Sequence, residues 1–126
     1  MKMSGILSGG VVLFSLTLAA HAQGVDDAKR GAQVFIQCKI CHSLEAGKNI
    51  LGPSLHGLIG RKAGSVPGYT YPPAMKNANV IWTADTLSKY LSDPKSFIPG
   101  DKMTFAGIKD PTKLGDLLAY LNQATR

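Results

Sequence analysis

The sequence contains few of the residues that several protein classes require. Only two of its 126 residues are cysteines, and both belong to one pair, Cys38-x-x-Cys41. A structural zinc site needs four ligands, usually as a second close pair, so the lack of a third cysteine argues against zinc. A thioredoxin-like protein needs a βαβ scaffold, and the hydrophobic pattern shows no alternation of strands and helices. Two common uses of this cysteine spacing are therefore disfavoured.

Repeats, low-complexity runs and linkers are also absent after the N-terminal segment. A chain of about a hundred residues forms one domain with a modest core. Acidic residues are few, with eight Asp and Glu against fourteen Lys and Arg, which gives a formal net charge of +6. This excess indicates attraction to acidic surfaces. It does not indicate nucleic-acid binding, because the basic residues are spread along the chain and do not alternate with aromatic clusters.

Residues 1–22 have the features of a cleaved secretory signal. Lys2 gives a short positive start, a mostly apolar stretch follows from Ile6, and Ala20-His21-Ala22 is an A-x-A cleavage site. Cleavage leaves residues 23–126 as the mature domain, with thirteen basic and eight acidic residues and a charge of +5. An uncleaved anchor is the alternative, although the stretch is shorter than the roughly 20 apolar residues of a spanning helix. Export places the chain in a periplasm-like compartment.

The most informative motif is Cys38-Lys39-Ile40-Cys41-His42. Two thiols three positions apart, followed at once by an imidazole, form the attachment site of a covalently bound haem. Each cysteine can form a thioether with one vinyl group of the porphyrin, and His42 is then fixed beneath the ring, where one nitrogen can bind iron. The motif therefore predicts one haem c, held through Cys38 and Cys41, with His42 as the proximal ligand.

An amphipathic helix is expected just before this motif. Small or apolar residues recur at i, i+3, i+4 and i+7, namely at Ala28, Gly31, Ala32 and Phe35. Asp26 or Asp27 is the expected N-cap. Gly31 costs a helix interior roughly 1 kcal/mol against alanine. The expected reason for keeping it is close contact with the final helix.

Two further helices are expected. One starts at Thr83, a good N-cap, and ends at Pro94. The last has Asp110 as its cap and Pro111 at its first position. Its apolar stripe consists of Leu114, Leu117, Leu118 and Leu121. Residues 43–70 are rich in Gly and Pro and predict loops with tight turns, so the fold class is all-α.

A six-coordinate haem needs a second protein ligand, for which the mature chain offers Met75, Met103 and His56. His56 is a lone loop histidine, a residue that more often belongs to polar surface. Met75 stands at the expected start of a short helix, where a buried packing methionine is the ordinary outcome. Met103 lies in an irregular segment after the Pro99-Gly100 turn, which can wrap over one side of the ring. Met103 is therefore preferred.

At this point the sequence resembles mitochondrial cytochrome c and its short bacterial relatives, the class I soluble cytochromes. The resemblance runs from about Ala28 to Thr125. It rests on Cys38-Lys39-Ile40-Cys41-His42, Gly52-Pro53-Ser54-Leu55-His56-Gly57, Gly60-Arg61-Lys62, Trp82 and Ile98-Pro99-Gly100-Asp101-Lys102-Met103-Thr104-Phe105-Ala106-Gly107-Ile108. It implies a small cytochrome c fold of short helices and loops wrapped around one haem. It also implies that the terminal helices cross, with Gly31 and Phe35 against Leu117 and Tyr120.

The resemblance implies roles for individual residues as well. Met103 would be the sixth ligand, with Tyr90 near its sulfur. The carbonyl of Pro53 would accept a hydrogen bond from the second nitrogen of His42, which fixes the tautomer and raises the basicity of the imidazole. A buried haem propionate requires donors, and the implied set is Arg61, Tyr71 and Trp82.

Some positions depart from the family pattern. Asp101 stands where a threonine commonly donates a hydrogen bond to a propionate, and a carboxylate there would be repelled unless it turned to solvent. Met75 stands where mitochondrial relatives usually carry a buried asparagine, which should alter the potential. Gln37 replaces a lysine of the mitochondrial docking ring. The basic residues expected around the exposed haem edge are Lys39, Lys48, Lys95, Lys102 and Lys109, with simple solvated lysines as the alternative.

The leading hypothesis is a soluble periplasmic one-electron carrier and not an enzyme. Ligation by His42 and Met103 keeps oxygen and peroxide off the iron, and a basic face guides transient docking that weakens as salt increases. The partners implied by the family are a quinol–cytochrome c oxidoreductase, a cytochrome oxidase, a photosynthetic reaction centre or a periplasmic dehydrogenase. Contact with membrane complexes is expected to be transient, and the chain is expected to be a monomer.

Two other hypotheses stay open. A peroxidase-like enzyme or a gas sensor would need a vacant or easily displaced sixth position, which the turn-flanked Met103 opposes. Alternatively, the domain serves as the dedicated partner of one dehydrogenase, which the sequence does not separate from a general shuttle.

Overall fold

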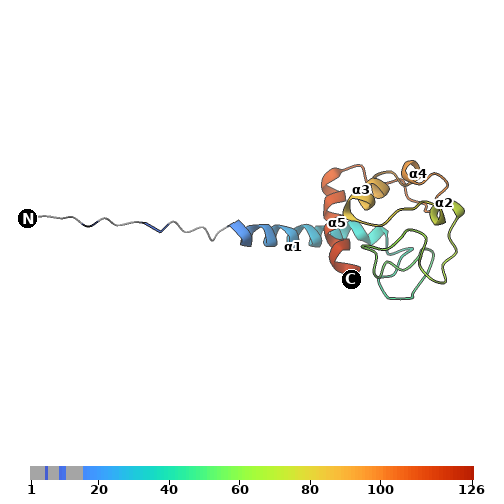
Figure 1. The fold of residues 1–126 in the computed structure, drawn as a ribbon, viewed down its shortest axis with the longest axis horizontal. Helices are drawn as coiled ribbons and strands as arrows, with labels where there is room; N and C mark the ends of the chain where they lie inside the picture. Colours follow the sequence, from blue (N-terminus) through green and yellow to red (C-terminus); the bar gives the residue numbers. More distant parts are fainter. Residues whose placement is uncertain (1–4, 6–8, 11–15) are drawn as a thin grey trace, which may run out of the picture.

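The computed structural model describes residues 5, 9–10 and 16–126 (Figure 1). In chain order, its elements are α1 (Leu16–Val34), the 3-10 helix η1 (Phe35–Gln37), α2 (Pro73–Lys76), α3 (Ala84–Ser92), α4 (Pro94–Phe97) and α5 (Pro111–Ala124). Outside the helices of this described part, the isolated antiparallel bridges are His42 with Asn49 and Lys62 with Ile81. The predicted all-α fold is confirmed.

The first helix begins earlier than the sequence analysis predicted. α1 starts at Leu16, so Asp26 and Asp27 lie inside it and neither is its N-cap. The reason is that residues 16–22 are rich in Leu and Ala, which have high helix propensity and continue the helix upstream. Asp27 instead pairs with Arg30 one turn later. That prediction is therefore wrong for the chain in this structure.

Much of the predicted secretory signal, including Lys2, lies outside the described residues, and its cleavage after Ala22 stays a prediction. Among the residues that are described, no helix has both the length and the apolar character needed to cross a membrane.

α5 crosses the C-terminal half of α1 (Figure 1). The two backbones approach closely at Gly31, where an added Cβ would lie 1.9 Å from the carbonyl oxygen of Asp116 and 2.7 Å from Cβ of Tyr120. The rings of Phe35 and Tyr120 pack with centroids 5.0 Å apart. The predicted contact between Gly31 and the final helix is confirmed, and a side chain at position 31 would prevent this approach.

An ion pair that the sequence did not indicate joins the same two helices. Asp116 is only 7% exposed, and both of its oxygens accept hydrogen bonds from Arg30. Nε lies 3.1 Å from Oδ2, and Nη2 lies 3.3 Å from Oδ1. The hydrogen bond with Asp116 raises the pKa of Arg30. Because this arrangement is bidentate, it fixes direction as well as supplying attraction.

The starts of the later helices follow the predicted capping residues. Thr83 caps α3 through a reciprocal capping box with Thr86. Asp110 caps α5 by accepting hydrogen bonds from the backbone of the first turn, and Pro111 occupies the first position. Both predicted starts are confirmed. The short helix α4, which begins at Pro94 immediately after α3, was not predicted.

One hydrophobic core joins the helices to the loops and positions the site. Its buried members are Phe35, Leu58, Ala63, Met75, Trp82, Leu87, Tyr90, Ile98, Ile108, Leu114, Leu117 and Leu121. Cys38, Tyr71 and Met103 are partly buried and pack against it. Three residues of the predicted site therefore lie where the core meets the loops.

Candidate haem-binding site

The two thiols and the imidazole of the motif share one turn of backbone. The backbone N–H groups of Cys41 and His42 both donate to the carbonyl of Cys38, at 3.1 and 2.9 Å. Both cysteines are uncrosslinked and half-buried. Burial raises the pKa of the Cys38 thiol to about 11, and the neighbouring Cys41 adds to the increase. The turn thus presents two sulfurs and one ring nitrogen within a short segment.

His42 is held from the side by the loop that follows it. Its Nδ1 lies 2.7 Å from the carbonyl oxygen of Pro53. Because a carbonyl can only accept, Nδ1 carries the proton and Nε2 keeps its lone pair. Burial lowers the pKa of His42 and the charge of Arg61 lowers it further, against the effect of the Pro53 carbonyl. The geometry therefore offers a neutral imidazole with one nitrogen free to bind a metal.

Gly52 is a site residue whose role the sequence analysis did not identify. A Cβ at this position would lie 2.5 Å from Cε1 and 2.9 Å from Nδ1 of His42. The backbone N–H of Gly52 also donates to the carbonyl of Cys41 at 2.7 Å. The chain therefore needs glycine here for close approach to the imidazole. The one signal in the sequence was a glycine directly before Pro53.

Polar contacts fix the loop that carries Pro53. The backbone N–H of Ser54 donates to the side-chain oxygen of Asn49 at 2.9 Å, and the Asn49 amide donates to the carbonyl of Pro67 at 3.0 Å. The hydroxyl of Ser54, which is 2% exposed, donates to the carbonyl of Glu45 at 2.6 Å. These bonds hold the carbonyl that orients His42, and none of them was predicted.

The predicted propionate donors Arg61, Tyr71 and Trp82 come from three segments, two of which are hydrogen-bonded to each other. The backbone N–H of Trp82 donates to the carbonyl of Arg61 at 2.9 Å. The Arg61 guanidinium donates to the carbonyls of Ser54 and His56, each at 3.0 Å. Trp82 is buried, and Tyr71 is half-buried with its pKa raised by burial. The structure thus brings Arg61 and Trp82 together, with Arg61 anchored to the loop that carries Pro53, whereas the Tyr71 hydroxyl accepts a hydrogen bond from the backbone N–H of Val66 at 3.2 Å.

Tyr90 and Met103 also come together. The Tyr90 hydroxyl lies 3.8 Å from the sulfur of Met103, which is half-buried. The same hydroxyl donates a hydrogen bond to Asp101. Burial raises the pKa of Tyr90, and the bond to Asp101 adds to the increase. Asp101 is 8% exposed and does not turn to solvent, which was the arrangement named as the way to avoid repulsion from a propionate. The physical reason is that Tyr90 supplies the donor that a buried carboxylate requires.

The other two candidate ligands lie elsewhere. Met75 is 7% exposed within α2 and belongs to the core, as expected of a packing methionine. His56 has an exposed side chain, and its carbonyl accepts one of the hydrogen bonds from Arg61. Its position fits the alternative of polar surface.

The lysines expected at the haem edge are all exposed, but they have different surroundings. Lys48 pairs with Glu45 at 3.3 Å, and Lys109 lies 4.0 Å from Asp93. Lys102 donates to the carbonyl of Thr70 at 2.6 Å and lies over the ring of Tyr69.

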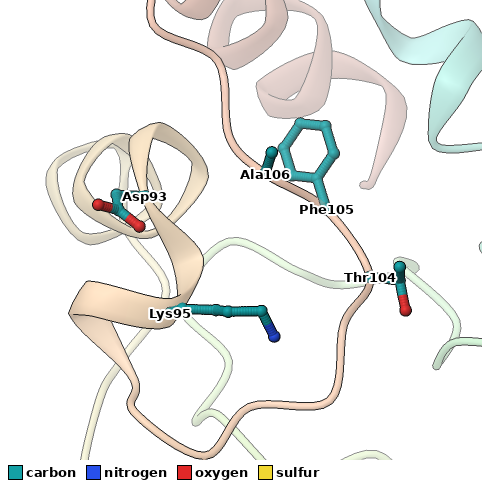
Figure 2. A pocket seen from close by; sticks show the side chains of 5 residues that line it. All are labelled: Asp93, Lys95, Thr104, Phe105 and Ala106. Carbon is teal, nitrogen blue, oxygen red and sulfur yellow. The ribbon is translucent and has the colours of Figure 1, made fainter.

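Lys95 lines an open groove next to the Met103 segment. The groove has a volume of about 410 Å³, and its lining residues are Asp93, Lys95, Thr104, Phe105 and Ala106. Figure 2 shows the Lys95 side chain extending from α4 toward the segment that carries Thr104 and Phe105. None of these five residues belongs to the predicted ligand set, so the groove lies beside the predicted haem site and none of the predicted iron ligands lines it.

The donor set fits a covalently attached haem. Two free thiols and an imidazole share one turn. Because Nδ1 of His42 is hydrogen-bonded to the Pro53 carbonyl, the lone pair on Nε2 is available to a metal. Gly52 has no side chain, which leaves space for the imidazole ring of His42. These are the groups that two thioether bonds and a proximal ligand need.

Comparison with known proteins agrees with this site. Residues 28–125 match the family described as Cytochrome c. The chain is 46% identical to a cytochrome c2 from Blastochloris viridis over 112 residues, which cover 88% of each chain. It is 51% identical to a cytochrome c from Cochliobolus lunatus over 102 residues, which cover 79% of this chain and 94% of the relative. The solved structure of cytochrome cH from Methylobacterium extorquens aligns with a TM-score of 0.71 and 43% identity, over 76% of this chain and 97% of that one.

Proposed function

This chain belongs to the cytochrome c family and carries haem c through Cys38 and Cys41, and we propose that it is a soluble one-electron carrier of the periplasm. Proteins of this family are haem electron carriers, and that coarse function applies here. The proposal adds the axial ligands, the compartment and the partners. When bound, haem c supplies an iron that takes up and gives back one electron.

The observation that carries the proposal is the placement of Met103. Its thioether packs against the core, with the buried Tyr90 hydroxyl 3.8 Å from the sulfur. A methionine held in this way would serve, with Nε2 of His42, as the second protein ligand of the haem iron. With both ligands supplied by the chain, the iron would have no position for a substrate. This occupancy separates a carrier from a peroxidase-like enzyme.

The chain's own residues have three tasks in this proposal. Pro53 and Gly52 hold the imidazole of His42 in one tautomer and one place. Arg61, with Tyr71 and Trp82, supplies donors for a propionate. The core around Phe35 and Leu58 excludes water, which favours the less charged, ferrous form of the cofactor.

The surface around the attachment turn suits brief contacts with redox partners. Lys39 and Lys95 are exposed and form no salt bridge within the described part of the chain. Ile40, which follows Lys39, is 71% exposed and Leu51 is 72% exposed; Leu51 directly precedes Gly52, whose backbone N–H donates to the carbonyl of Cys41. Positive charge steers an acidic partner toward this face, and the apolar side chains add short-range contact. The partners we propose are a quinol–cytochrome c oxidoreductase, a cytochrome oxidase, a reaction centre or a periplasmic dehydrogenase.

The optical spectrum of the purified holoprotein tests the ligand assignment. We expect a weak near-infrared sulfur-to-iron band in the ferric form, and its loss in Met103→Ala. The Met75→Leu variant is the matched control, because its side chain is a core methionine, and it should keep the band. Immediate binding of carbon monoxide by the reduced wild type would contradict the proposal and favour an enzyme or sensor with an open iron.

Cell fractionation tests the compartment. We expect the holoprotein in the periplasmic fraction, with a mass that corresponds to a chain starting at Gln23. Recovery of haem-bearing protein that retains residues 1–22 in the membrane fraction would instead support the uncleaved anchor.

A further inference from the structure

The hydroxyl of Tyr90 lies between two acceptors. It donates to Oδ2 of Asp101, and it lies 3.8 Å from the sulfur of Met103. A phenol has one proton to donate. The hydrogen bond to Asp101 and a hydrogen bond to Met103 therefore exclude one another at any moment.

Both partners of the Asp101 bond are held in place by their surroundings. The Tyr90 ring is 6% exposed in α3 and packs against Trp82, with ring centroids 4.9 Å apart. The backbone N–H of Asp101 donates to the carbonyl of Ile98 at 3.0 Å. Gly100 forms the turn between them with a φ of 93°, a left-handed conformation that favours glycine. The backbone at Asp101 and the packing of Tyr90 thus hold the carboxylate beside the phenol.

The chemistry of the two acceptors decides which one receives the proton. A thioether sulfur is a weak acceptor, whereas a carboxylate oxygen forms the strong, charge-assisted kind of hydrogen bond. Asp101 is 8% exposed, and a buried carboxylate without a donor would carry a large desolvation cost. The energetic preference therefore points the proton toward Asp101.

We propose that Asp101 is a positioning residue that holds the Tyr90 proton away from the sulfur of Met103. The proposal rests on the assignment of Met103 as the sixth ligand. A hydrogen bond to the sulfur would compete with ferric iron for lone-pair density. By capturing the proton, Asp101 leaves the thioether a stronger donor to the ferric iron and makes it harder for an outside ligand to displace.

Imidazole affinity of the ferric holoprotein tests this idea, because imidazole binds only after displacing the sixth ligand. Asp101→Val removes the acceptor and frees the hydroxyl to bond the sulfur. We expect tighter imidazole binding by about fivefold, the size of one hydrogen bond. Asp101→Asn loses the charge but keeps an acceptor oxygen, so it should bind imidazole like the wild type. Thr104→Val, an exposed neighbour of Met103, is the control for loss of a polar side chain.

A Tyr90→Phe background shows whether the effect of Asp101→Val acts through the Tyr90 hydroxyl. In that background Asp101→Val should no longer change the affinity, because there is no proton to redirect. An equal effect with and without the Tyr90 hydroxyl would overturn the proposal and assign the effect to charge or packing. An Asp101→Asn variant that behaves like Asp101→Val would do the same.

Folding of the valine variant does not limit the test. If Asp101→Val does not fold, Asp101→Asn still tests the proposal, and imidazole binding by Asp101→Asn about fivefold tighter than that of the wild type would overturn it. Failure of the ligand assignment looks different: the wild type would then lack the near-infrared sulfur band from the start.

Discussion

Gly31 of α1 and Asp116 of α5 are in direct backbone contact, since a Cβ on Gly31 would lie 1.9 Å from the Asp116 carbonyl oxygen. The same Asp116 receives the bidentate hydrogen bonds of Arg30. Glycine in a helix interior is normally unfavourable. Here its absence of a side chain permits the crossing that brings Phe35 and Tyr120 together.

Gly31→Ala should therefore destabilise the holoprotein by about 3 kcal/mol, the upper end of ordinary overpacking, because two backbones must separate. Gly115→Ala is the matched control. Gly115 lies in α5, and an added Cβ would meet no atom within 4 Å. That variant should gain about 1 kcal/mol from helix propensity alone. Denaturant unfolding followed by circular dichroism measures both, and a neutral Gly31→Ala would contradict the crossing described here.

Gly52→Ala should disturb the imidazole of His42. The new Cβ would stand 2.5 Å from Cε1, about 1 Å short of an ordinary carbon contact. We expect the hydrogen bond to Pro53 to weaken and the fraction of correctly ligated holoprotein to fall. The Nδ1–H resonance of His42 in histidine-labelled protein reports this directly.

Pro53→Ala serves as the comparison for the glycine variant. Because alanine retains the carbonyl at position 53, the Nδ1 hydrogen bond should persist and the resonance should move little. If both variants shifted it equally, loop rigidity and not close contact would explain the role of Gly52.

Neutralising two lysines should slow oxidation of the reduced protein by an anionic probe. Lys39→Gln with Lys95→Gln removes two exposed charges that form no salt bridge in the described part of the chain. Stopped-flow oxidation by hexacyanoferrate(III) should be several-fold slower at low ionic strength. The oxidation rate of the variant should also depend less on salt concentration, because dissolved ions screen the attraction between lysine and probe over distances beyond a Debye length of about 10 Å, and the variant has less attraction to screen. Lys29→Gln, on an exposed part of α1, should have a much smaller effect.

Acid should remove the contribution that the Asp93 carboxylate makes to the free energy of unfolding. Hydrogen bonds from the hydroxyl and backbone N–H of Ser96 lower its pKa below the ordinary 3.8. A carboxyl with a depressed folded-state pKa adds stability above its unfolded value and loses it as the pH falls through the folded value. The difference in unfolding free energy between wild type and Asp93→Ala should therefore shrink as pH is lowered from neutral to below 3.8. A difference that stays constant with pH would assign the effect to packing.

Most parts of the structure predicted from sequence depend on residues close together in the chain; the contact of Gly31 with α5 is the exception, because a glycine inside a helix indicates close packing. The motif from Cys38 to His42 makes one turn, and the Thr83 and Asp110 caps act within their own first turns. Such signals carry their geometry with them. The start of α1 was predicted wrongly because the signal of an acidic cap competed with the propensity of the residues before it.

The unpredicted parts need partners that are distant in sequence. Nothing near Asp116 indicates that it will be buried against Arg30, which lies 86 positions away. Gly52 requires glycine only because the loop brings it against His42. For Asp101 the sequence indicated only repulsion from a propionate unless its carboxylate turned to solvent, whereas in the structure Tyr90 from α3 donates a hydrogen bond to it.

The sequence by itself determined the attachment chemistry, since two thiols three positions apart and an adjoining imidazole define a haem attachment site without reference to the rest of the fold. Tertiary structure alone decided the environment of that site: why position 52 must be glycine, which carboxylate shares the phenol beside Met103, and which cation the buried Asp116 meets. The physical reason is that the thiols and the imidazole lie within five consecutive residues, whereas burial and competition between hydrogen-bond acceptors arise only after distant segments have packed together.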